Sequence, residues 1–176
     1  MAMTLSGTSV KATVSTTATN IETAETQTAK LSLSKTGTIT FAAGDAAGQA
    51  ETVWARTESI AAGGNWDIDL NAGEVNAFGD TIAFDIVRAV LVINPAATGD
   101  PEIYVGGAGA NEFDSWLGDP SDTVIVHAGG MFLLATPGNT TTNGYVTGAG
   151  QNILRIHNSD GAVAAVVQVV VLGCIA

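Results

Sequence analysis

The sequence predicts an all-β fold, because three observations point to strands and none points to helices. Short runs of β-type residues recur with Gly, Pro, Asn and Asp between them, most densely in the last third of the chain. Several segments alternate apolar and polar residues with period two, as half-buried strands do. No long window shows helical periodicity. The pattern is typical of a β-sandwich or a β-barrel.

Residues 1–42 are predicted to form an N-terminal arm with the first strands, and residues 43–176 a single β-sandwich domain. The arm is rich in Thr, lacks Trp and Tyr, and has too few large apolar side chains to bury itself alone. Within it, 30–34 and 38–41 alternate as half-buried strands do, whereas 16–28 is predicted to be an extended or loosely ordered connection. We expect the arm to lean on the body or on a neighbouring subunit.

The first half of the body contains three predicted strands. The run 51–60 follows a loop of small residues and alternates along its length. The run 65–70 alternates as well, which places Asp67 and Asp69 together on the face opposite the apolar side chains. After a turn, the run 81–94 is apolar over most of its length and ends before a proline. It is predicted to be a central strand.

The second half begins with loops over residues 96–122, interrupted by one short predicted strand at 102–105 and a glycine-rich tip. An apolar cluster follows, which we expect to close one end of the sandwich or to dock on a partner. The cluster consists of Phe113, Trp116 and Leu117.

Five further runs complete the body: 123–127, 130–136, 144–147, 152–158 and 162–173. The residues Asn158 to Gly161 are a turn sequence that commonly joins antiparallel strands. The runs 153–157 and 163–172 are therefore predicted to pair as a terminal hairpin.

Charge is distributed unevenly between the two predicted parts. Residues 1–42 hold three Lys against two Glu, or +1, and the remainder holds three Arg against fifteen acids, or −12. The acidic body argues against nucleic acid as a partner, because phosphate binding depends on clustered Lys and Arg. No segment approaches the ~20 apolar residues of a membrane span, and no signal-peptide pattern is present, so we expect synthesis in a cytoplasm and no membrane partner.

Two carboxylates are the first candidates for chemistry. Asp67 and Asp69 would lie roughly 7 Å apart on one strand face, a separation at which two carboxylates can hydrolyse a glycosidic bond or hold Ca²⁺. A solvated outer face explains the pair more simply, and the spacing of neighbouring residues does not fit a calcium loop. No metal is assigned.

The remaining candidates favour structural roles. His127 and His157 lack a second ligand at metal-binding spacing, and no nucleophile motif accompanies them. The tip 106–111 has the composition of a phosphate-binding loop, but neither a helix nor a Lys-Ser/Thr pair follows it. Cys174, the only cysteine, is expected to be a small buried side chain. Asn139 begins a formal glycosylation motif.

Aromatic residues offer a last alternative, since a sugar can stack on exposed rings. The candidates for such a platform are Trp54, Trp66, Trp116 and Tyr145, although core positions are favoured for all of them. We therefore predict no catalytic, cofactor-binding or metal-binding residue, no cofactor, and a protein that is not an enzyme.

Three runs, 48–54 (GQAETVW), 66–71 (WDIDLN) and 86–94 (IVRAVLVIN), together resemble small virion proteins of tailed bacteriophages. The segments 129–134 (GGMFLL), 145–146 (YV) and 172–173 (LG) continue the likeness, which covers about residues 44–173. It is a pattern of strands and turns without a catalytic signature. The resemblance implies a jelly-roll-like antiparallel β-sandwich.

The resemblance also implies a capsid decoration, or cement, protein that clamps adjacent major capsid subunits and stabilises the head. Its partners would be the major capsid protein and itself, as a homotrimer, on the outer surface of a virion assembled in the host cytoplasm. The alternative is a host-recognition module on a tail or head fibre, in which Trp54, Trp116 or the tip 106–111 contacts glycan. A carbohydrate-active enzyme built on Asp67 and Asp69 is a third hypothesis.

Overall fold

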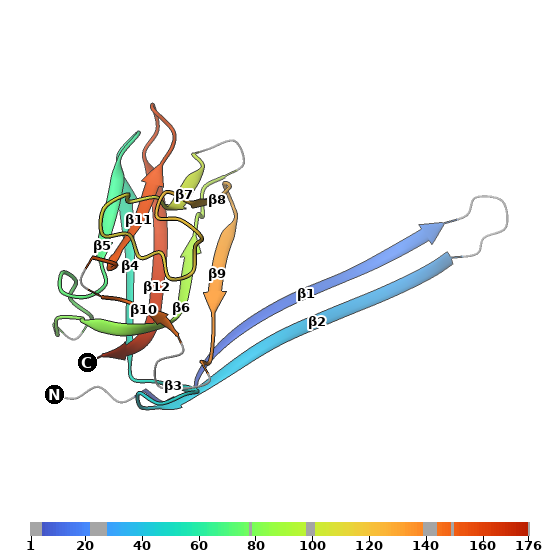
Figure 1. The fold of residues 1–176 in the computed structure, drawn as a ribbon. Helices are drawn as coiled ribbons and strands as arrows, with labels where there is room; N and C mark the ends of the chain where they lie inside the picture. The colour runs from blue at the N-terminus through green and yellow to red at the C-terminus, as the bar shows by residue number, and fades with distance from the viewer. Residues whose placement is uncertain are drawn as a thin grey trace.

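The computed structural model describes residues 5–21, 28–77, 79–97, 101–138, 144–148 and 150–175, with side chains from 5–16 and from 32 onward within these ranges. All regular secondary structure in this part of the chain is β, so the all-β prediction is confirmed. Two antiparallel sheets form a sandwich, and a long hairpin projects from one end of it (Figure 1).

The larger sheet has β4 (Thr52–Ile60) at one edge, followed by β12 (Ala165–Ile175) and β6 (Phe84–Ile93). Two short strands share the far edge of β6, namely β9 (Met131–Ala135) and β10 (Tyr145–Val146). The run 81–94 is thus a central strand, as predicted.

The smaller sheet follows the order β5, β11, β7 and β8. Its strands are β5 (Asn65–Asp69), β11 (Ile153–Asn158), β7 (Ile103–Gly106) and β8 (Thr123–Val126). Four antiparallel pairs are nested across the two sheets: β4 with β12, β5 with β11, β6 with β9, and β7 with β8. Such nesting results when one long hairpin is wrapped around a core, and it is compatible with a β-sandwich.

The core lies between the two sheets and explains the period-two patterns. On β11, Leu154 and Ile156 are fully buried while Arg155 faces outward, and Trp54 of β4 is buried at 2% exposure. Each such large side chain contributes about 1.5–3 kcal/mol of burial free energy. The central members of the cluster are Trp54, Ile68, Phe84, Val90, Val92, Ile103, Val105, Leu154, Ile156, Val167, Val169 and Val171.

The predicted terminal hairpin is wrong. β11 pairs with β5 and β7, whereas β12 pairs with β4 and β6, so the two strands belong to different sheets. Asn158 lies between the sheets, where its side-chain amide donates to the carbonyls of Ile60 (3.3 Å) and Val163 (2.8 Å). The turn residues were identified correctly, but they carry the chain across the core instead of reversing it within one sheet.

The hairpin consists of β1 (Thr8–Ile21) and β2 (Thr28–Ala43), and β3 (Gln49–Ala50) pairs in parallel with the end of β2. The expectation of an extended connection over 16–28 is wrong in part, because β1 continues to Ile21. The two short strands expected at 30–34 and 38–41 form one strand, and side chains 32–38 are exposed instead of half-buried. We call β1 and β2 together the arm.

Candidate interaction surface

The two faces of the arm differ in chemistry. In an antiparallel pair, directly opposed residues share a face, and the face alternates along each strand. The register pairs Val10 with Ile39 and Thr16 with Leu33, and Val14 lies between these pairs on the same face. The side chains on this face are Val10, Ala12, Val14, Thr16, Leu33, Lys35 and Ile39, and we call it the apolar arm face, with Lys35 as its one charged member.

The opposite face carries hydroxyl and Lys side chains only, over the part of the arm whose side chains are described. Across the ribbon, the hydroxyls of Thr13 and Thr36 lie 3.0 Å apart, within hydrogen-bonding distance. The side chains on this polar face are Ser9, Lys11, Thr13, Ser15, Ser34, Thr36, Thr38 and Thr40. The arm is therefore amphipathic over the part whose side chains are described, 8–16 and 32–43.

The apolar arm face is covered at its base and open further out. Val10 and Ile39 pack against a buried cluster that includes Phe41. Beyond this point Val14 is 68% exposed and Leu33 is 43% exposed. The apolar arm face is therefore packed against the body at the base of the arm and exposed to solvent further out.

A second apolar surface lies on the larger sheet, on the side that faces away from the core. Cross-strand register places four side chains of adjacent strands in line, which gives successive rows. The first row is Val53, Leu172, Ala89 and Ala135, the second is Ala55, Val170, Leu91 and Leu133, and the third is Thr57, Gln168, Ile93 and Met131. We call these three rows the outer sheet face; none of its side chains is charged.

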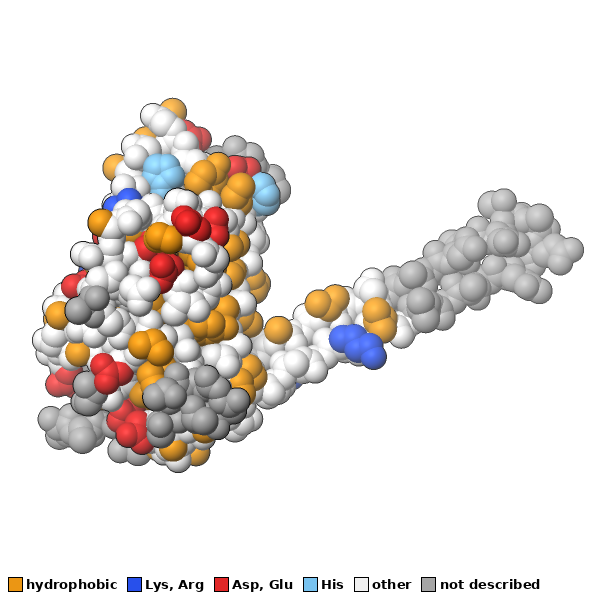
Figure 2. Space-filling model, in the orientation of Figure 1, with side chains coloured by type: hydrophobic (Ala, Val, Ile, Leu, Met, Phe, Trp, Pro, Cys, Tyr) orange, Lys and Arg blue, Asp and Glu red, His pale blue; other side chains and the backbone are white. Residues whose placement is uncertain are grey.

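The base of the arm covers only the first of these rows. Leu172 and Ala89 are each 5% exposed, and they share a cluster with residues of the arm. Further along the same face Met131 is 68% exposed and Val166 is 47% exposed. Figure 2 shows hydrophobic side chains on the side of the body from which the arm projects. The side chains of the second and third rows are thus partly or fully exposed, which leaves a contiguous apolar surface in contact with solvent.

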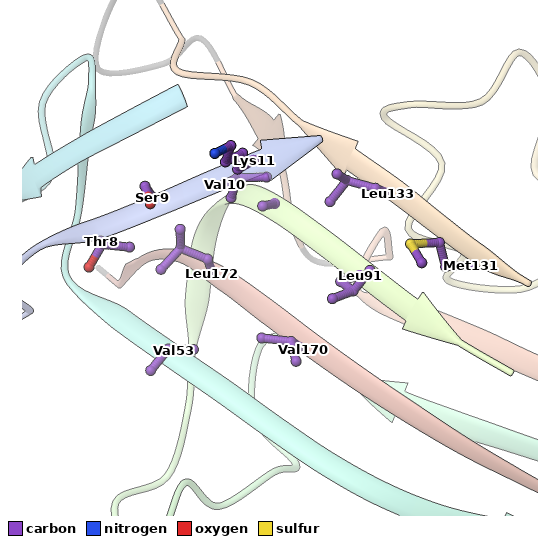
Figure 3. Close-up of a pocket in the computed structure, with 11 residues that line it drawn as sticks. Thr8, Ser9, Val10, Lys11, Val53, Leu91, Met131, Leu133, Val170 and Leu172 are labelled. Carbon is purple, nitrogen blue, oxygen red and sulfur yellow. The ribbon is translucent and has the colours of Figure 1, made fainter. Parts of the chain in front are cut away.

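The two surfaces meet at a pocket of about 340 Å³. One wall is the start of β1, from Thr8 to Lys11, and the other wall is the outer sheet face around Leu91 and Leu133. Figure 3 shows these side chains on β1, β4, β6, β9 and β12, with Val10 and Leu172 near the junction. The pocket lies at the junction where the arm leaves the larger sheet.

The arm and the body carry opposite charge. Lys11 and Lys35 are exposed on the arm, and Lys35 lies directly opposite Val14. The sequence places fifteen acidic residues against three Arg beyond residue 42, and Figure 2 shows Asp and Glu side chains distributed over the visible face of the body. The arm of one molecule is therefore attracted to the body of another.

The carboxylate pair proposed from the sequence is engaged in structural contacts. Asp67 accepts two hydrogen bonds from the Arg155 guanidinium group, from Nε to Oδ1 at 2.6 Å and from Nη2 to Oδ2 at 2.7 Å. These bonds hold the pKa of Asp67 below its usual range. Asp69 Oδ1 accepts from the backbone of Asn71 (2.9 Å) and from the side chain of Asn152 (2.7 Å), so it fixes a turn.

Glu112 has the largest pKa shift of any acid among the described residues, and no sequence pattern singled it out. It is 2% exposed, and burial raises its pKa to about 7. Its Oε2 accepts a hydrogen bond from the Ala108 backbone, whereas no described group lies within hydrogen-bonding distance of Oε1. Arg155 and Asp114 are charged neighbours that lower and raise this pKa respectively. Protonation of Glu112 relieves the cost of burying its charge.

The glycine-rich tip is held by the same group of side chains. Arg155 donates to the carbonyls of Ala108 (3.2 Å) and Gly107 (3.5 Å), and Glu112 binds the backbone of this loop. Gly106 has φ of +102° and lies against the backbone of Asp122, so a side chain cannot be placed there. The start of the loop is therefore packed against the sandwich, whereas Gly109, Ala110 and Asn111 are exposed.

The histidines lie apart on the surface of the sandwich. His127 Nδ1 is 2.8 Å from Glu102 Oε1, and its side chain is 72% exposed. His157 Nδ1 is 2.7 Å from Asn65 Oδ1, and its ring packs edge-on against Tyr104. Among the described residues no three His, Cys, Asp or Glu side chains are grouped so that they could hold a metal ion.

The aromatic candidates belong largely to the core. Trp54 is buried and its ring centroid lies 5.9 Å from that of Trp66. Trp116 packs on Phe132 at 5.1 Å, and its indole nitrogen donates to the Phe113 carbonyl at 2.8 Å. With Phe113 fully buried, this cluster closes the sandwich, which is one of the two roles expected for it.

Two further candidates are settled by position. Tyr145 is half-buried against the core, and burial raises its pKa. Cys174 is buried as expected, and burial raises the pKa of its thiol. The glycosylation motif that begins at Asn139 lies outside the described residues.

The Thr-rich N-terminal arm is predicted from the sequence, but its apolar face is not. The signal was present, since Val10, Ala12 and Val14 alternate with Lys11 and Thr13. It was hidden by the abundance of Thr, which fits either face of a strand. The outer sheet face gave no separate signal, because a strand that is apolar on both sides indicates burial on both sides.

Comparisons with protein-family models, with curated proteins and with solved structures each gave no match. Among the described residues no helix is long and apolar enough to cross a membrane. The features that bear on function are therefore the apolar arm face and the outer sheet face.

Proposed function

We propose that this protein is a virion structural protein, a capsid decoration protein that clamps adjacent major capsid subunits and stabilises the head. The observation that carries the proposal is the arm, an amphipathic ribbon that leaves the sandwich with Val14 and Leu33 exposed. A two-stranded ribbon is marginally stable at best when it stands alone in water. Contact with another protein surface offsets the entropy of ordering it.

The body supports the same role. The carboxylates and histidines singled out as candidates for chemistry are engaged in contacts with neighbouring side chains and turns. A protein that occupies many equivalent places on a shell acts mechanically, and multivalent attachment allows weak individual contacts to add up to firm binding. A rigid sandwich with a projecting arm is suited to such attachment.

The copy number in purified particles tests the proposal. Quantitative mass spectrometry should find a ratio near one per major capsid subunit, or a simple fraction of it set by the symmetry of the attachment sites. A few copies per particle would contradict a shell role and would favour the fibre-borne, glycan-binding module instead.

Deletion of residues 1–42 tests the arm directly. The truncated chain should keep a cooperatively folding sandwich, because the main core lies between Trp54 and Val171. Its binding to particles that lack the protein should weaken by at least about tenfold, as expected when an anchoring contact is lost. Binding would be measured by co-sedimentation, with circular dichroism as the folding control. Unchanged binding would remove the arm from the mechanism.

A further inference from the structure

We propose that the apolar arm face of one copy docks on the outer sheet face of a second copy, so that copies are joined by arm exchange. The inference is independent of any capsid, since it concerns two surfaces of the same chain. The first reason is that each surface is apolar and largely uncovered, which is costly in a soluble molecule.

The second reason is that the two surfaces already pack on each other where they meet. Val10 and Ile39 of the apolar arm face share a cluster with Ala89 and Leu172 of the outer sheet face. The same types of side chain continue outward on both surfaces, with Val14 on the arm and Leu91 and Leu133 on the sheet. The arm of a second copy can therefore pack on the outer sheet face as the base of the arm already does within one chain.

The third reason is that the dimensions agree. From Ala12 to Ile21 the arm extends roughly 30 Å beyond its base, at ~3.3 Å per residue, and β12, with 11 residues, spans roughly 35 Å. A ribbon about 10 Å wide would cover roughly 300 Å² of the sheet. Counting both surfaces, reciprocal exchange between two copies would bury roughly 1,200 Å², which lies at the lower end of the range of stable interfaces.

The fourth reason is charge. The described arm presents Lys11 and Lys35, and the body beyond residue 42 is strongly acidic. The three rows of the outer sheet face are uncharged, so docking there buries no unpaired carboxylate. Lys35 shares the apolar arm face with Val14, and its flexible stem has to carry the ammonium group past the edge of the ribbon into solvent. Reciprocal exchange gives a closed dimer, and exchange in one direction around a ring gives a closed trimer.

The test is the association state of the purified full chain, measured by sedimentation velocity over a range of concentrations. The wild-type chain should form a closed dimer or trimer. The double variant Val14→Gln, Leu33→Gln should raise the dissociation constant by at least about tenfold, as is common when central interface residues are lost. Both positions are exposed, so the variant should fold.

The matched control is Thr13→Gln, Ser34→Gln, which places the same side chains on the polar face of the arm beside the first two positions. It should change the dissociation constant by less than about twofold, because it leaves the apolar face intact. On the sheet, Met131→Gln should weaken association, whereas Ile125→Gln on the smaller sheet should not; both side chains are exposed. Equal effects of variant and control would overturn the proposal.

Cross-linking distinguishes exchange between copies from other modes of association. A chain with Leu33→Cys is mixed with a chain with Met131→Cys, both on a Cys174→Ser background, and a disulfide-linked heterodimer is expected after oxidation. A strictly monomeric wild-type chain, or failure of these chains to cross-link, would overturn arm exchange. Loss of particle binding on arm deletion, combined with a monomeric chain, would leave the capsid role intact and assign the arm to the capsid protein.

Discussion

At the scale of single residues, polar groups at the glycine-rich tip are joined into one network. Arg155 on β11 binds Asp67 on β5 and two carbonyls of the tip, and the buried Glu112 binds the same loop. A group with a raised pKa holds its proton in the folded state at a pH where the unfolded chain has lost it. Stability therefore depends on pH through Glu112.

Glu112→Gln should remove that dependence. In the folded chain the pKa is about 7 against an ordinary value of 4.5, so wild-type stability falls as pH rises from about 4.5 through 7. The loss is at most about 3 kcal/mol, from ~1.4 kcal/mol per pH unit. Urea unfolding at pH 5 and pH 8 should show a smaller difference for the variant than for the wild type. An equal difference would show that Glu112 ionises freely.

Asp67 should behave in the opposite sense and serves as the contrasting variant. Its pKa is lowered by the Arg155 hydrogen bonds, so its contribution is present above its ordinary pKa and is lost as pH falls. Asp67→Asn should therefore reduce stability at neutral pH and have less effect in acid. Arg155 and Asp67 are 88 residues apart in the chain, and single-sequence patterns contain no information on such a pair.

At the scale of elements, strand positions were predictable and strand partners were not. Alternation located 51–60 and 65–70, and a long apolar run located 81–94, because one or both faces of each strand are buried. The turn residues after β11 suit a hairpin within one sheet and a crossing between two sheets equally well, because the chain reverses direction in both. Partner choice depends on which faces can meet in the core, and this is a property of the whole sandwich.

The irregular pairing between β12 and β6 should be sensitive to one added methyl group. The register shifts after Leu172, and a Cβ on Gly173 would lie 2.3 Å from the Ile86 carbonyl oxygen. Gly173→Ala should destabilise the fold by about 2–4 kcal/mol, because backbone must move to admit it. Gly161→Ala, where no atom lies within 4 Å of the added Cβ, is the control in thermal unfolding and should be nearly neutral. Similar melting temperatures would show that the bulge can relax.

At the scale of the whole molecule, charge and apolar surface act on different stages of the proposed association. Attraction between a basic arm and an acidic body accelerates encounter and is screened by salt, whereas apolar contact is not weakened by salt. The association rate constant, measured by fluorescence energy transfer between labelled copies, should fall by about tenfold between low and high ionic strength. The dissociation rate constant should change little. A dissociation rate that rises steeply with salt would indicate an interface held by ion pairs.

The nested strand order also constrains the time course of folding. β12 lies between β4 and β6, although more than seventy residues separate it from either of them along the chain. During synthesis β4 and β6 therefore leave the ribosome before β12, and the edges with which they pair to β12 stay unpaired until β12 has emerged. Closing such distant contacts is slow, and exposed edges in the meantime favour aggregation. We expect the nascent chain to depend on chaperones during this interval, while the arm, whose two strands are adjacent in sequence, can pair first.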